Sequence, residues 1–197
     1  MKHILTLLML PITMTVFAQS PDTSQVIITD EQDSIVYKMG DQVIKFSHKD
    51  LSALSVEKGI NYASTGDFQS ALSEFNAALL YSPDDPDIYY NIGLAYYYLE
   101  DLEQSIAHLS RGIELAPGNN KLYSQRGISY SVGGLYESAL TDFNKMLEID
   151  PGSSEARANI GATYLLLENT IEACKYLKEA AEMGNEKAIS LVGQYCE

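Results

Sequence analysis

The chain has 197 residues, of which 46% are hydrophobic and 20% charged, which is enough for one domain with a buried core. Its 27 Asp and Glu residues outnumber 13 Lys and Arg residues, and the formal net charge is −14. Because such a surface repels phosphate backbones, we expect no nucleic-acid partner and favour a neutral or basic polypeptide. Solubility alone explains the charge equally well.

The first eighteen residues have the pattern of a secretory signal peptide. Lys2 and His3 precede an apolar stretch, Ile4 to Phe17, and Ala18 supplies a small residue for cleavage. We predict cleavage after Ala18 and a periplasmic or secreted protein. The alternative is an uncleaved anchor, but the apolar run is short for about 30 Å of hydrocarbon, so we expect no stable membrane anchor.

Residues 19–50 form an N-terminal extension with the pattern of strands. Val26–Thr29, Ser34–Lys38 and Gln42–Phe46 are rich in β-branched and aromatic residues. Met39-Gly40-Asp41 between the last two runs predicts a β-hairpin turn. An isolated hairpin is marginally stable in water, so it either docks as an N-terminal cap or offers a strand to another chain.

From residue 52 onward, identical residues recur every 34 positions. A glycine is followed three residues later by a tyrosine in each copy, and a proline ends the first three copies. These residues are Gly59, Gly93, Gly127 and Gly161; Tyr62, Tyr96, Tyr130 and Tyr164; and Pro83, Pro117 and Pro151. Such a fixed period predicts a solenoid of one repeated unit, here two amphipathic helices joined by a short turn.

The pattern predicts helices separated by short turns. Asp85 is expected to cap one of them, with Pro86 at its first position. The expected ranges are about 49–65, 68–81, 86–99, 102–115, 120–133, 136–149, 154–167 and 170–183, followed by a ninth helix at 186–197.

The repeat resembles the tetratricopeptide-repeat (TPR) family over residues 52–185. The second copy reads Tyr89-x2-Ile92-Gly93-x2-Tyr96, and Ala139-x3-Phe143 matches the second half of the family pattern. The resemblance implies an all-α, right-handed α-solenoid of four TPR helix pairs (52–85, 86–119, 120–153 and 154–187). A capping helix at 186–197 completes it, and a short N-terminal β-hairpin is possible. Residues 180–188 locally resemble the related Sel1-like repeat.

Four positions depart from the family pattern. Lys58 and Arg126 stand where it has leucine, and Ser55 and Arg157 stand where it has a large aromatic residue. Terminal repeats are expected to be atypical because one side faces water. Arg126 is internal, and we expect its stem to pack while its head reaches solvent.

The resemblance also implies that the first helix of each pair lines a concave groove that binds a protein or peptide. By phase, the partner-binding residues are Asp87, Tyr90, Asn91, Leu94, Tyr97, Tyr98, Lys121, Gln125, Ile128 and Asn159, with Ser124 and Glu155 also facing the groove. Some TPR domains clamp a C-terminal carboxylate with a Lys/Asn/Arg set. Only Asn91 and Lys121 match that set here, which disfavours a clamp.

The sequence shows no catalytic constellation: neither a G-x-S-x-G nor a G-x-x-x-x-G-K-[ST] motif occurs. His48 and His108 are expected to be surface or cap residues rather than bases. Two cysteines do not make a four-ligand zinc site. We therefore expect no enzyme, no cofactor and no metal. The leading hypothesis is an extracytoplasmic adaptor or scaffold; the alternative is a structural solenoid that self-associates as a homo-oligomer.

Cys174 and Cys196 are the two cysteines of the chain. Cys174 lies near the start of the last repeat's second helix, and Cys196 lies near the end of the capping helix. Antiparallel packing of these helices would bring both residues to the same end, so a disulfide is possible in an oxidising compartment. Two free thiols are the alternative.

Overall fold

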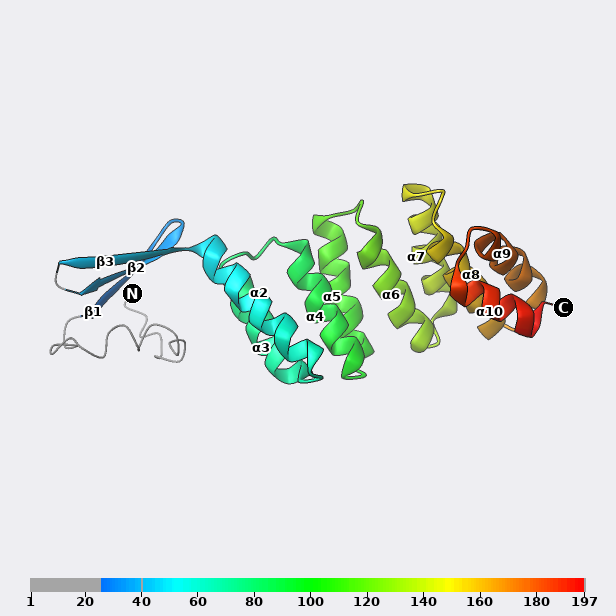
Figure 1. Ribbon diagram of the computed structural model, residues 1–197, viewed down its shortest axis with the longest axis horizontal. Helices are drawn as coiled ribbons and strands as arrows, with labels where there is room; N and C mark the ends of the chain where they lie inside the picture. The colour runs from blue at the N-terminus through cyan, green and yellow to red at the C-terminus, as the bar shows by residue number, and fades with distance from the viewer. Residues whose placement is uncertain (1–25, 40, 197) are drawn as a thin grey trace. The chain divides into compact units, whose positions relative to one another are not determined.

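A computed structural model of the chain describes residues 26–39 and 41–196 (Figure 1). The predicted signal peptide, 1–18, and the start of the extension, 19–25, lie outside the described residues. The chain divides into two compact units, Met1–His48 and Lys49–Glu197.

The first unit contains a three-stranded antiparallel sheet of β1 (Val26–Glu31), β2 (Ser34–Met39) and β3 (Gln42–Ser47), in the order β1-β2-β3. β2 and β3 are the predicted hairpin strands, and Met39 pairs with Gln42. The sheet extends this hairpin by one strand, because β1 pairs along the whole length of β2. A three-stranded sheet is less marginal in water than an isolated two-stranded hairpin.

The second unit is helical, and its helices follow one another in chain order (Figure 1). Nine helices lie in the described residues, each within two residues of its predicted bounds, so the predicted series of helix pairs is confirmed. They are α2 (His48–Ser64), α3 (Phe68–Leu79), α4 (Pro86–Tyr98), α5 (Leu102–Leu115), α6 (Asn120–Val132), α7 (Tyr136–Ile149), α8 (Ser154–Leu166), α9 (Thr170–Glu182) and α10 (Glu186–Tyr195).

Side-chain caps fix where these helices begin. Asp67 and Asp101 accept hydrogen bonds from the backbone N–H groups of Ser70 and Gln104, each at 3.1 Å. Asp85 caps α4 with Pro86 at the helix start, as the sequence predicts. Each cap pairs a backbone donor that has no partner within its own helix, so the polar turn residues set the repeat's boundaries.

The recurring glycine allows the two helices of a pair to approach closely. A Cβ atom on Gly93 would lie 2.5 Å from Leu109 Cγ, and one on Gly127 would lie 2.5 Å from Phe143 Cε1. Leu109 and Phe143 are fully buried core residues. The glycine recurs in every repeat because the same ridge of the second helix fills the space above it.

Arg126 does not reach solvent as predicted, and that expectation was wrong. Its Nε and Nη2 donate to the two carboxylate oxygens of Asp142 at 2.8 and 2.7 Å, and its Nη1 donates to Ser110 Oγ at 2.8 Å. The Arg126 and Asp142 side chains are 18% and 4% exposed. Burial lowers the pKa of the Arg126 guanidinium, but the hydrogen bonds and charge of Asp142, together with Tyr130 and Tyr123, offset this and the net pKa is raised. The head is held by a buried partner.

Two tyrosines flank the guanidinium of Arg126, and one repeat earlier the equivalent tyrosines flank His108, which stands in the column of Asp142. Arg126 Cζ lies 5.9 Å from the ring centroid of Tyr123 and 5.7 Å from that of Tyr130. One repeat earlier, the equivalent tyrosines contact His108, whose ring stacks on Tyr96 at 5.5 Å. His108 is therefore half-buried rather than the surface or cap residue predicted, and burial lowers its pKa. The two repeats fill one aromatic slot with different side chains.

Candidate functional site

The first helices of the pairs, α2, α4, α6 and α8, form what we call the first-helix face. α4 contacts α6, and α6 contacts α8. Two pockets open on this face, and α4 contributes to both. The phase of the repeat therefore places side chains from separate repeats around shared pockets.

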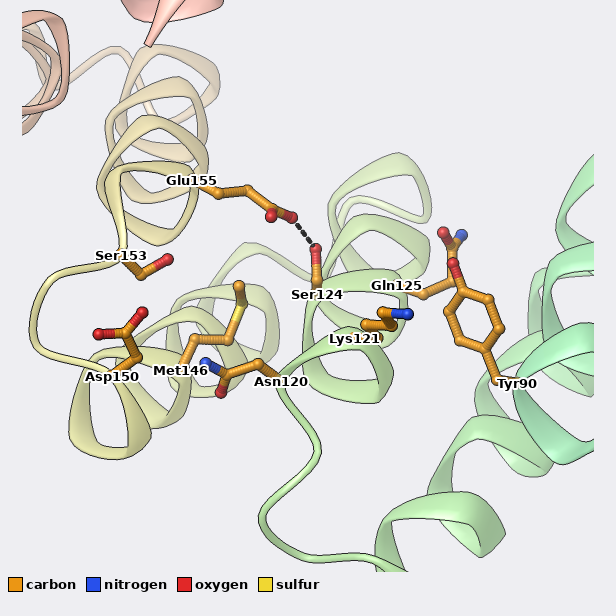
Figure 2. Close-up of a pocket in the computed structure, with 9 residues that line it drawn as sticks. All are labelled: Tyr90, Asn120, Lys121, Ser124, Gln125, Met146, Asp150, Ser153 and Glu155. Carbon is orange, nitrogen blue, oxygen red and sulfur yellow. Dashed lines mark hydrogen bonds between the residues drawn. The ribbon is translucent and has the colours of Figure 1, made fainter. Parts of the chain in front are cut away.

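The polar pocket has a volume of about 400 Å³ and lies where α4, α6 and α8 meet the end of α7 (Figure 2). Its lining residues are Tyr90, Asn120, Lys121, Ser124, Gln125, Met146, Asp150, Ser153 and Glu155. They carry one cation and two carboxylates, so the pocket has a negative balance.

Hydrogen bonds fix both carboxylates of the polar pocket. Ser124 Oγ on α6 donates to Glu155 Oε1 on α8 at 2.5 Å, the contact drawn as a dashed line in Figure 2. Asp150 Oδ1 accepts from the backbone N–H of Gly152 at 2.9 Å. The pKa of Tyr90 is raised, first by burial and then by the negative charge of Glu155. The field of Glu155 thus extends to the ring on α4.

Two amides of the polar pocket have polar atoms without partners. Gln125 is only 8% exposed, and its Nε2 has no hydrogen-bond partner in the described part of the chain. The same holds for Asn120 Oδ1. Most buried polar atoms in folded proteins are paired, so a buried donor and a buried acceptor left unpaired in one pocket make it a candidate site for a ligand with both groups.

The apolar pocket has a volume of about 500 Å³ and lies between α2, α3 and α4. Its lining residues are Ile60, Ala63, Ser64, Gly66, Phe68, Phe75, Asn91, Leu94, Ala95 and Tyr98. Tyr98 is 56% exposed and stacks on Phe68 at 4.8 Å between ring centroids. This pocket suits an apolar side chain rather than a charged one.

Six of the ten predicted partner-binding residues line these pockets. Tyr90, Lys121 and Gln125 are in the polar pocket, and Asn91, Leu94 and Tyr98 are in the apolar pocket. The other four line neither. These are Asp87, exposed at the start of α4; Tyr97, edge-on to Tyr98; Ile128, packed against the core; and Asn159, 8% exposed.

Asn120, Met146, Asp150 and Ser153 also line the polar pocket but were not predicted. Met146 and Asp150 belong to the end of α7, and Asn120 and Ser153 lie at the starts of α6 and α8. The Asp-Pro-Gly-Ser sequence at 150–153 could have indicated Asp150 and Ser153, because it forms the turn that joins two repeats.

Comparison with family profiles finds the same repeat that the geometry shows. A profile described as a TPR repeat matches residues 59–99, and two described as tetratricopeptide repeats match 86–119 and 154–183. The chain is a TPR protein. The Sel1-like resemblance of residues 180–188 stays a prediction.

Solved structures share the TPR fold with this chain. MamA is 24% identical, with a TM-score of 0.64 over 72% of this chain and 87% of its own. YrrB, described as a TPR protein with an unusual peptide-binding site, is 25% identical, with a TM-score of 0.63 over 71% and 73%. The first TPR of Spaghetti, bound to the HSP90 peptide SRMEEVD, is 23% identical, with a TM-score of 0.57 over 60% and 94%. No curated protein matched.

TPR domains typically mediate protein or peptide binding and are usually non-catalytic scaffolds. In this TPR protein, Asn91 lines the apolar pocket and Lys121 lines the polar pocket. Within residues 26–39 and 41–196 there is no group of three side chains suited to a metal, and no helix there is long and apolar enough to cross a membrane.

The TPR array ends in a disulfide. Cys174 of α9 is bonded to Cys196, just after α10, with 5.4 Å between their Cα atoms. The two cysteines are 22 positions apart in sequence, and the bond links the end of the capping helix α10 to α9 of the last helix pair.

Proposed function

We propose that this TPR protein is an extracytoplasmic adaptor that holds an extended segment of a protein partner along its first-helix face. The observation that carries this proposal is the pair of pockets of opposite character that share α4: the polar pocket contains Tyr90, and the apolar pocket contains Leu94. An apolar pocket supplies affinity, and a polar pocket fixes register and specificity.

The size of the face sets the length of the partner segment. Packed helices lie about 10 Å apart, so four first helices extend over roughly 30 Å. An extended chain advances about 3.3 Å per residue, so about nine residues reach from α2 to α8. YrrB, the 25% identical TPR protein, is described as having a peptide-binding site, which agrees with this assignment.

The disulfide supports the extracytoplasmic location, because disulfides persist in oxidising compartments and are rare in the cytosol. The predicted signal peptide points to the same address. Mass spectrometry of the native protein tests it: a mature chain beginning at Gln19 supports the proposal, and an intact Met1 contradicts it.

Capture of the partner tests the groove. Tyr90→Ala with Tyr98→Ala removes one aromatic ring from each pocket, and we expect crosslinked partner recovery to fall at least about tenfold, since aromatic anchors dominate such interfaces. Tyr195→Ala is the matched control, because Tyr195 is 47% exposed on α10 and lines neither pocket. Equal partner recovery by the native protein, the Tyr90→Ala/Tyr98→Ala protein and the Tyr195→Ala protein would rule out binding in the groove. Light scattering that shows a concentration-dependent oligomer would instead favour self-association.

A further inference from the structure

The polar pocket holds a buried donor and a buried acceptor that the folded chain does not pair. Gln125 Nε2 can donate and Asn120 Oδ1 can accept, and both atoms are buried. Leaving such atoms unpaired is unfavourable, and a ligand that pairs them recovers the loss. A peptide main chain offers C=O acceptors and N–H donors at every residue, so an extended segment matches both atoms.

The charges of the polar pocket add a side-chain preference. Asp150 and Glu155 supply two carboxylates, and Lys121 is the single cation among the nine lining residues. Gly152 N–H and Ser124 Oγ hold one oxygen of each carboxylate in place, so little ordering is needed when a ligand binds. A cationic side chain satisfies fixed carboxylates, whereas an acidic one is repelled.

We propose that the polar pocket recognises a lysine or arginine side chain within the extended segment, through Asp150 and Glu155, while Gln125 and Asn120 hold the segment's main chain. This inference rests on the proposed function and names the chemistry of its ligand. The net charge of −14 favours the same partner, because it steers basic segments toward the protein.

The test uses the full chain and a displayed library of random peptides of about twelve residues. Enriched peptides are synthesised with a fluorescent label, and each is paired with a version in which the basic residue is replaced by methionine, which is uncharged and of similar length. We expect the basic peptide to bind about tenfold more tightly than its methionine version, as two carboxylate contacts allow.

Three variants test whether the preference for the basic peptide comes from Asp150 and Glu155. Asp150→Asn with Glu155→Gln keeps the oxygens that bond Gly152 and Ser124, and should reduce the tenfold preference to about twofold or less. Glu103→Gln with Glu182→Gln makes the same charge change on α5 and α9, outside both pockets, and should keep the preference. Gln125→Leu should weaken basic and methionine peptides by the same factor, as expected for main-chain contacts.

The outcomes separate this inference from the proposed function. Enriched peptides without a basic residue, or a preference that survives in the Asp150/Glu155 variant, overturn the basic-side-chain inference while leaving the groove intact. Peptides that bind equally well to the Tyr90→Ala/Tyr98→Ala protein, or no enrichment at all, overturn the proposed function and the inference together.

Discussion

The buried ion pair of the third repeat predicts a specific failure and a specific rescue. Arg126 and Asp142 are 16 residues apart, and the same columns hold Ile160 and Tyr176 in the fourth repeat. Arg126→Ile should therefore destabilise the protein strongly, and adding Asp142→Tyr should restore most of the loss, because the pair then matches one that this chain already packs.

The magnitude follows from burial. Asp142 is 4% exposed, so removing Arg126 leaves a carboxylate almost fully out of water without its guanidinium. Breaking a buried ion pair in this way costs about 3–5 kcal/mol, a large part of a typical domain's total of 5–15 kcal/mol. Asp142→Tyr alone should cost less, because the stem of Arg126 can carry its charge toward solvent.

Urea unfolding followed by far-ultraviolet circular dichroism measures both effects, since the chain has no tryptophan to serve as a fluorescent probe. The double variant should lie within about 1.5 kcal/mol of the native protein, which corresponds to a coupling energy of roughly 2 kcal/mol or more. If Arg126→Ile lowers the free energy of unfolding by less than about 1 kcal/mol, the ion pair does not contribute importantly to stability. A double variant as unstable as Arg126→Ile would refute the interchange of columns.

Three further predictions concern the core, the disulfide and acid stability. Gly127→Ala should cost about 1–3 kcal/mol in urea unfolding, because its Cβ would lie 2.5 Å from Phe143 Cε1, whereas Gly193→Ala on α10 meets nothing within 4 Å and should be neutral or stabilising. Cys196→Ser should lower the free energy of unfolding by about 3 kcal/mol, and reductant should bring the native protein to the same value; a native protein insensitive to reductant would contradict this. Burial lowers the pKa of His108 from 6.5, so the unfolded state takes up the proton first as pH falls. Stability should therefore be full above about pH 6.5 and decrease below it, with a flatter profile for His108→Tyr; identical profiles would show that His108 does not contribute.

The helical part of the fold was predictable because the period identifies the repeat before any packing is known. The glycine and the large side chain that packs over it are 16 positions apart in every copy, so the sequence indicates the same helix–helix contact in each repeat. The third strand, β1, was harder to assign. Its pattern indicates a strand, but its pairing with β2 depends on a short turn at 32–33 that has no glycine or proline.

The candidate site was only half predictable. Helix phase identifies Tyr90, Lys121 and Gln125, whose positions follow from the first helices alone. It says nothing about Asp150, which enters the polar pocket from the turn between two repeats. Phase also places Ile128 in the groove, and its half-buried side chain packs against the core around Tyr123.

The Arg126–Asp142 pair was available in the sequence through comparison of its own copies. Where the column of Arg126 is basic, at 58 and 126, the column of Asp142 is acidic, at 74 and 142. Where the first column is isoleucine, at 92 and 160, the second holds a ring. The third repeat considered alone shows only that Arg126 replaces an expected leucine. Comparison of all four copies indicates that a basic residue at this position is accompanied by an acidic residue 16 positions later.

The bond between Cys174 and Cys196 determines from which end the array frays. In a linear stack each unit is held only by its neighbours, so the outermost units unzip first and exchange their amide hydrogens fastest. The crosslink ties α9 to the end of α10 and leaves α2 and α3 as the end that opens more readily. A thiol reductant would open the second end as well, and the array would then unzip from both sides toward α6 and α7.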